Sequence, residues 1–236
     1  MSQTEVKQEI IKYITQKRLN KGDRLPPENE LATNLKLSRI TLRDALRQLK
    51  DDGLIYSRQG SGTFIAADVK EIFGTLSKNL SMTEMITISG FKPGVSLYEV
   101  EFIEADDELA FKLNVKSGTG VLLCKRVRTA DDEAVVFSKD YLSPRTAEIF
   151  LTHHEKEFSL FKILEEENNI KIGNSFAEIY PMKCNRELAD KLHYNEGEPI
   201  LVLKQTVVDK EGKPLFYGEE YFRPDKFKFT INRRRS

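Results

Sequence analysis

Basic side chains recur at helical spacing early in the chain. They lie at steps of four, four and three residues: Arg39, Arg43, Arg47 and Lys50. The apolar residues of the same segment would form the opposite helix face: Leu42, Ala45, Leu46 and Leu49. Such a helix packs by one face and can offer the other to the phosphates and base edges of a nucleic acid. A solvated basic face on a small helical domain is the alternative.

The elements around this segment favour a helix-turn-helix. Pro27 suits the first turn of a short helix over 28–35, because proline lacks the N–H that has no partner there. Ser38 can cap the next helix, over 39–52, and Gly53 can end it. The N-terminus of the second helix is the end that recognition helices present to DNA.

A short hairpin follows the second helix. Residues 54–59 and 63–65 are expected to form its strands, with Gly60–Gly62 as the turn. The glycines let the backbone approach a phosphate or a groove floor, and Arg58 adds a positive charge nearby. A hairpin appended to a helix-turn-helix is a wing, which favours DNA binding over the solvated alternative.

These segments closely resemble the N-terminal DNA-binding domain of the GntR family of transcription regulators. The resemblance rests on Leu25–Ala32, Leu37–Leu46, Leu49–Ile55 and Gln59–Ile65. It implies that phosphates and base edges are contacted by Ser38, Arg39, Thr41 and Arg43, and that Gln59 and Gly60 enter the minor groove. Asn29 stands where many members carry arginine. With the basic face and the wing, the predicted DNA-binding residues are Asn29, Ser38, Arg39, Thr41, Arg43, Arg47, Arg58, Gln59 and Gly60.

Charge and length fit a two-domain regulator. The 236 residues exceed one ordinary domain, and the net charge is zero over the whole chain. Residues 1–67 hold twelve Lys or Arg and eight Asp or Glu, against twenty-five and twenty-nine afterwards, so the two parts carry +4 and −4. No apolar run approaches the roughly 18 residues of a membrane helix, and no signal peptide is visible, so a cytoplasmic location is expected.

An internal repeat organises the remainder. Glu108–Leu113 recurs as Glu187–Leu192, and the flanking segments align so that each unit reads strand, helix, strand, turn, strand. Two units of this kind can join in one antiparallel sheet with helices packed against it. The predicted fold class is therefore α+β.

Two arginines distinguish the first copy of the repeat. Arg126 and Arg128 share one strand face by period-two alternation, whereas their counterparts are Gln205 and Val207. Two guanidinium groups on one side can bind a phosphate or carboxylate. Salt bridges with acids of the same domain are the second interpretation, and spacing does not decide between them.

The second part also resembles a known module, the UTRA effector domain of the HutC branch of GntR regulators, which has a chorismate-lyase-like fold. The resemblance rests on Lys125–Arg128, Phe158–Glu165 and Tyr221–Phe229. It implies an anion site formed by Thr83, Arg126, Arg128 and Ser159, with Tyr221 as a pocket wall. Phe216 stands where an acidic residue can bind sugar hydroxyls.

The expected domains are a winged helix-turn-helix at 1–67, a linker at 68–80 and an effector-binding and dimerisation domain at 81–236. We expect a homodimeric repressor whose affinity for a palindromic DNA operator is controlled by a small anion such as a phosphorylated sugar or a carboxylate. No cofactor, metal or membrane partner is expected. Two alternatives stay open: an enzyme, because the implied fold includes a lyase, and a DNA-binding protein that responds to no ligand.

Overall fold

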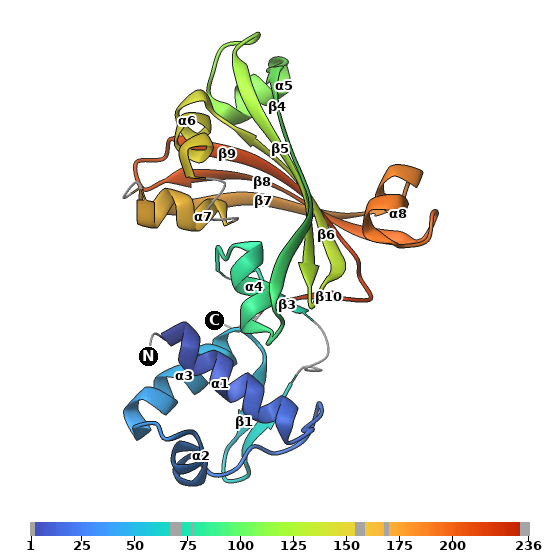
Figure 1. Cartoon of the computed structure of the whole chain (residues 1–236). Coiled ribbons are helices and arrows are strands. Elements are labelled where there is room, and N and C mark those ends of the chain that lie inside the picture. Colours follow the sequence, from blue (N-terminus) through green and yellow to red (C-terminus); the bar gives the residue numbers. More distant parts are fainter. Residues whose placement is uncertain (1–2, 67–71, 77, 154–158, 168–169, 232–236) are drawn as a thin grey trace. The chain divides into compact units, whose positions relative to one another are not determined.

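The computed structural model describes residues 3–66, 72–76, 78–153, 159–167 and 170–231 (Figure 1). The chain divides into two compact units. The first unit comprises Met1–Leu80, Glu84–Lys92 and Phe227–Ser236, and the second comprises Ser81–Thr83 and Pro93–Lys226.

The first unit begins with three helices and a hairpin. These are α1 (Gln3–Gln16), α2 (Glu28–Leu35), α3 (Arg39–Asp51), β1 (Ile55–Arg58) and β2 (Gly62–Ile65). The Oγ of Ser38 accepts a hydrogen bond from the backbone N of Thr41, 3.1 Å away, which confirms the predicted cap of α3. Gly62 in the hairpin has φ of +114°, a conformation that side-chain-bearing residues rarely adopt.

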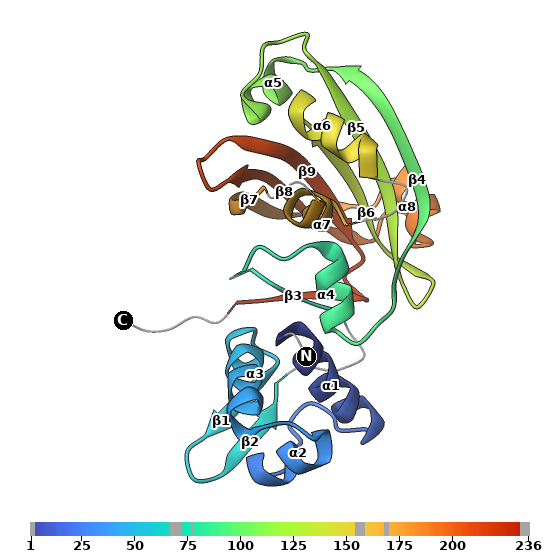
Figure 2. The ribbon, with the colours of Figure 1, turned by 60° about the vertical axis from the view of Figure 1, so that its left-hand side comes forward.

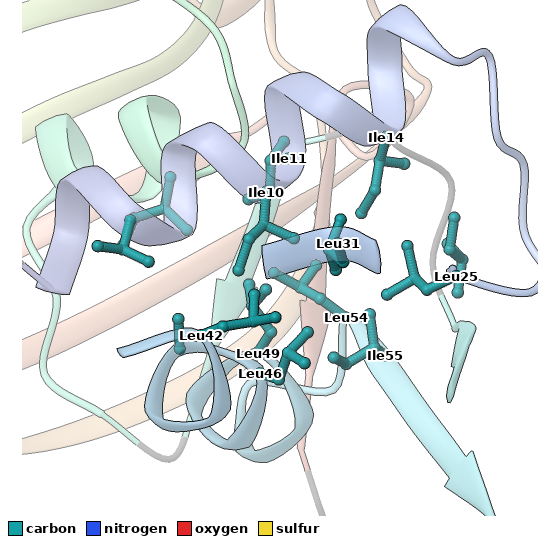
Figure 3. Close-up of a cluster of buried hydrophobic side chains, with 14 of the residues drawn as sticks. Ile10, Ile11, Ile14, Leu25, Leu31, Leu42, Leu46, Leu49, Leu54 and Ile55 are labelled. Carbon is teal, nitrogen blue, oxygen red and sulfur yellow. The ribbon is translucent and has the colours of Figure 1, made fainter. Parts of the chain in front are cut away.

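Apolar faces from α1, α2, α3 and β1 converge in one core (Figure 3). The predicted apolar face of α3 is buried there, with Leu42 and Leu49 fully inaccessible. Burying each such side chain contributes about 1.5–3 kcal/mol. Because this face is committed to the core, the basic face of α3 is left in solvent.

Part of the predicted linker is a strand. Residues 72–75 form β3, which pairs in parallel with β10 (Phe227–Thr230) near the end of the chain. Gly74 permits this packing, because a Cβ at that position would overlap the ring of Phe229. Residues 68–71 and 77 of the predicted linker lie outside the described residues. The helix α4 (Met82–Ile88) follows β3, and from Glu84 onward it belongs to the first unit.

The second unit is built on a six-stranded antiparallel sheet in the order β4-β5-β6-β9-β8-β7 (Figures 1 and 2). The first copy of the repeat is β4 (Pro93–Glu104), α5 (Asp107–Leu113), β5 (Gly120–Ala130) and β6 (Glu133–Leu142). The second copy is β7 (Ile172–Lys183), α8 (Arg186–Leu192), β8 (Pro199–Asp209) and β9 (Pro214–Phe222). The last strands of the two copies, β6 and β9, pair at the centre. This confirms the α+β class and the joining of the two units in one sheet.

Helices cover both faces of the sheet. The segment between the copies forms α6 (Pro144–His153), α7 (Leu160–Lys162) and a π-helical turn η1 (Ile163–Glu167). These three pack on the face that carries Leu122 and Cys124, which we call the inner face. Helices α5 and α8 pack on the opposite, outer face, against Tyr217 and Phe137 respectively.

Candidate nucleic-acid interface and anion site

The basic face of α3 is exposed as predicted, and two of its arginines have acidic neighbours. The Nε of Arg43 lies 2.6 Å from Glu28 Oε2 of α2, and Arg47 Nη2 lies 3.4 Å from Asp44 Oδ1. Glu28 raises the pKa of Arg43. Ion pairs between exposed side chains are weak and are screened by salt, so a phosphate can replace either acid. Spacing within α3 could not reveal Glu28, which belongs to another helix.

The N-terminus of α3 gathers small hydroxyls and an apolar side chain. The Oγ of Ser38 lies 2.8 Å from Thr41 Oγ1, and Arg39 between them is exposed. Ile40 is 76% exposed although it is β-branched and apolar. An apolar side chain at this place can contact a thymine methyl group. Ile40 was not among the predicted DNA-binding residues, although its position between Arg39 and Thr41 was a signal for it.

Aromatic side chains hold the wing arginine in place. The Arg58 guanidinium lies 5.4 Å from the ring of Tyr56 and 5.5 Å from the ring of Phe64, and these rings stack on each other. Gln59 and Gly60 are exposed at the tip, and Gly60 has open space around it. A Cβ at Gly62 would lie 2.7 Å from Arg24 Nε, so a cation that we did not predict packs on the wing.

Asn29 is exposed on α2, where its backbone oxygen accepts a hydrogen bond from Thr33 Oγ1. All nine predicted DNA-binding residues thus lie in the first unit, on α2, on α3 with its cap, or on the wing.

In the second unit, Arg126 and Arg128 are both buried on the inner face, with exposed fractions of 1% and 6%. Arg126 Nη2 makes a short ion pair with Asp140 Oδ2 of β6, and its guanidinium lies 6.0 Å from the ring of Phe150 of α6. The salt-bridge interpretation therefore holds for Arg126. Burial and the neighbouring Arg126 lower the pKa of Arg128 to about 9.

Further polar residues join the two arginines. They form what we call the polar cluster, which consists of Arg126, Arg128, Ser138, Asp140, Gln205 and Glu220. Gln205 Nε2 donates to Glu220 Oε1 at 3.1 Å. Burial, together with the negative charge of Asp140, raises the pKa of Glu220 to about 8. Period-two alternation on β6 and β9 was the signal that could have found Asp140 and Glu220.

The structure does not bring Tyr221 to the arginines. Tyr221 follows Glu220 in β9, and consecutive strand residues point to opposite faces. Its ring stacks on Phe137 on the outer face, and its hydroxyl donates to Glu219 Oε2 at 2.9 Å.

Ser159 and Thr83 lie on helical elements of the second unit. Ser159 is buried at the N-terminus of α7, in the layer over the inner face, where its Oγ accepts from Lys162 N at 3.4 Å. Thr83 is half-buried in the first turn of α4.

The described residues contain no helix long and apolar enough to cross a membrane. Within the same part of the chain, no group of three His, Cys, Asp or Glu side chains is placed to hold a metal ion. Cys124 and Cys184 are both buried and form no disulfide.

Comparison with known proteins gives matches over both parts of the chain. Residues 2–65 match the model of the bacterial regulatory proteins of the gntR family, and residues 89–228 match the UTRA domain. The HTH-type transcriptional repressor NagR of Bacillus subtilis is 29% identical over 207 residues, covering 87% of this chain and 84% of NagR. The mannosyl-D-glycerate transport/metabolism system repressor MngR of Escherichia coli is 30% identical over 224 residues, covering 94% and 91%. The crystal structure of PhnF from Mycobacterium smegmatis superposes with a TM-score of 0.63 at 24% identity, covering 98% of this chain and all of PhnF.

Proposed function

The chain belongs to the GntR family of bacterial transcription regulators and carries a UTRA effector domain, and from this premise we propose that a small anion bound in the polar cluster controls its affinity for a palindromic operator. Like these relatives, it is a transcription regulator and not an enzyme. Two relatives are named repressors, and we propose repression here too. The observation that carries the proposal is the pair of buried arginines on one strand of the effector domain.

On DNA, the protein acts as a homodimer whose two α3 helices enter successive major-groove half-sites. Ser38, Arg39 and Thr41 contact base edges and phosphates from the helix N-terminus, which is exposed apart from the half-buried Thr41. The wing follows the adjacent minor groove, with Arg58 held near the backbone by its aromatic support. Since the operator of a bacterial regulator lies in the cytoplasm, we propose that location for the protein.

The charges of the polar cluster favour one anion. Two guanidinium groups, those of Arg126 and Arg128, lie on the face of the sheet where Asp140 pairs with Arg126, and burial raises the pKa of Glu220 beside them. An anion between Arg126 and Arg128 could accept hydrogen bonds from both groups. Ser159 supplies a hydroxyl from the covering layer, and Thr83 is a proposed contact from α4. Tyr221 is left out because it lies on the outer face.

The burial of Arg126 links ligand binding to a change of conformation. Its guanidinium is covered by α6, α7 and η1, so a ligand reaches it only when this layer moves from the sheet. An anion therefore stabilises an arrangement of the effector domain that is rare without it. We propose that this arrangement no longer fits the spacing of the two half-sites.

Replacing Arg39 with alanine tests the DNA interface. A guanidinium at the N-terminus of the recognition helix contributes about 1–3 kcal/mol to binding, so operator affinity should fall about 5- to 150-fold at fixed salt. The operator is obtained by selection from random duplexes with the wild-type protein, and affinity is then measured by titration. Lys116→Ala, which removes an exposed cation from the second unit, is the matched control. Wild-type affinity of Arg39→Ala would refute the docking geometry.

A thermal-shift screen with phosphorylated sugars, carboxylates and phosphonates tests the anion site. A ligand at 100 times its Kd should stabilise the protein by about 2.7 kcal/mol and should also change operator affinity. Arg128→Gln should abolish both effects. Lys125→Gln should preserve them, because Lys125 is the neighbour on the outer face and pairs with Glu101. A shift that survives in Arg128→Gln would place the ligand elsewhere.

A further inference from the structure

Gly218 lets the carboxyl oxygens of the polar cluster approach the backbone of β9 closely. It lies on β9, paired with Asp140 of β6 on one side and with Gln205 of β8 on the other. Its backbone is ordinary extended strand, so its conformation does not require glycine. A Cβ there would lie 3.0 Å from Glu220 Oε1 and 3.4 Å from Asp140 Oδ1. Glycine inside a strand often marks the place where another group approaches the backbone closely.

Glu220, two residues further along β9, has a carboxyl oxygen without a hydrogen-bond partner among the described residues. The side chain is 3% exposed, and its Oε1 accepts from Gln205. Its Oε2 is buried without a hydrogen bond to any of the described residues. Burying a polar atom without a hydrogen-bond partner costs free energy and is rare in folded proteins, so this oxygen requires an explanation.

The internal repeat shows that pairing within the sheet does not require Glu220 Oε2 to lack a hydrogen-bond partner. Glu220 is the counterpart of Asp140, and Gln205 is the counterpart of Arg126. In the first copy the arginine pairs with the acid. In the second copy an amide takes the place of the arginine and satisfies only one of the two carboxyl oxygens.

We propose that Gly218 and Glu220 form a second end of the effector site, and that the effector carries a hydrogen-bond donor, a hydroxyl or an ammonium group, at a distance from its anionic group. This inference rests on the proposed anion site. The donor would bind Oε2 of the ionised Glu220 carboxylate and would stabilise that charged form, while the anion lies at Arg126 and Arg128. Strands β5 and β9 are separated by β6, so the two ends are roughly 10 Å apart. The effector is thus a short molecule with different groups at its two ends.

Three phosphate esters of equal chain length test the donor end of the site separately from the anion end. They are 4-aminobutyl phosphate, 4-hydroxybutyl phosphate and n-pentyl phosphate, used with the full-length protein in calorimetric titration. The wild type should bind at least one donor-bearing phosphate about tenfold more tightly than n-pentyl phosphate, as expected for a hydrogen bond to a carboxyl group. The amine and hydroxyl arms show which donor the site takes.

Two variants and one control assign the preference to this place. Glu220→Met removes both oxygens. Gly218→Ala places a methyl group 3.0 Å from Glu220 Oε1 and so displaces the carboxyl group while leaving every charge unchanged. Each variant should reduce the preference to about twofold or less. Glu219→Gln is the matched control, because this neighbour on β9 binds Lys204 and Tyr221 on the outer face. It should retain the wild-type preference.

The outcomes separate the two proposals. If the three phosphates bind equally well to the wild type and depend on Arg128, the anion site stands and the donor end is wrong. Equal preference in wild type and Gly218→Ala would also overturn the donor end. If none of the phosphates binds, both proposals fail for this class of anion.

Discussion

Replacing Arg126 with alanine should destabilise the second unit by about 3–5 kcal/mol. The substitution removes the cation that pairs with Asp140, whose side chain is 6% exposed. A carboxylate left in this environment must either remain charged without a partner or take up a proton. The loss is measured by urea denaturation with hydrogen exchange of β5 and β6, which reports on the second unit separately from the first.

The same strand offers the control for this result. Lys125 pairs with Glu101 on the outer face, where Glu101 is exposed, so Lys125→Ala should cost no more than about 1 kcal/mol. The double variant Arg126→Met with Asp140→Leu removes both charges and should recover most of the lost stability. A loss below about 1 kcal/mol in Arg126→Ala would mean that the ion pair is not part of the folded core.

This result bears on how ligand experiments are interpreted. Arg126 has two roles in our proposal, since it holds Asp140 in the sheet and also faces the anion. A loss of ligand response in Arg126→Ala would therefore follow from instability as readily as from a lost contact. Arg128 is the better probe of the anion site, and Arg126 is the better probe of the sheet.

Local patterns predicted the first unit well. The bounds of α2, the Ser38 cap of α3 and the hairpin all follow from residues within a few positions of each other. The order of elements in the second unit was also predictable, because the repeat shows the same pattern twice. In each case the residues that determine the element either recur at a regular spacing or lie next to each other in the chain.

Contacts between distant segments were not predictable in this way. The pairing of β3 with β10 joins residues 72–75 to 227–230, and neither segment shows a period that requires a partner. Two-residue alternation on β6 and β9 indicates Asp140 and Glu220 as candidates, but the choice between them as partner of Arg126 depends on the strand order, which spacing does not give. The same alternation excludes Tyr221 from the face that carries Glu220. The resemblance to a family grouped Tyr221 with the arginines, and strand geometry shows that it lies on the other face of the sheet.

A second buried ion pair lies at the C-terminal end of the recognition helix. Lys7 Nζ of α1 lies 2.7 Å from Asp52 Oδ2, and both side chains are 6% exposed. Lys78 Nζ lies 2.8 Å from the other carboxylate oxygen, and Thr230 Oγ1 donates to the Asp52 backbone oxygen. One residue thus joins α1, the end of α3, the segment after β3 and strand β10.

Asp52→Ala should destabilise the first unit by about 3–5 kcal/mol, because Lys7 would keep its charge in a buried site without a partner. Lys78 is 38% exposed and can return to water, so Lys78→Ala should cost much less. The measurement is hydrogen exchange of α1 and α3 in urea, with operator affinity determined on the same samples.

Asp44→Ala is the matched control for Asp52→Ala, since Asp44 is an acid of the same helix in an exposed pair with Arg47. It should change stability by less than about 1 kcal/mol. If Asp52→Ala loosens only the last turn of α3 and leaves α1 protected, the carboxylate acts as a local cap. If both helices lose protection together, Asp52 ties the recognition helix to the rest of the first unit, and movement of β10 can then reach the DNA-binding surface through a single side chain.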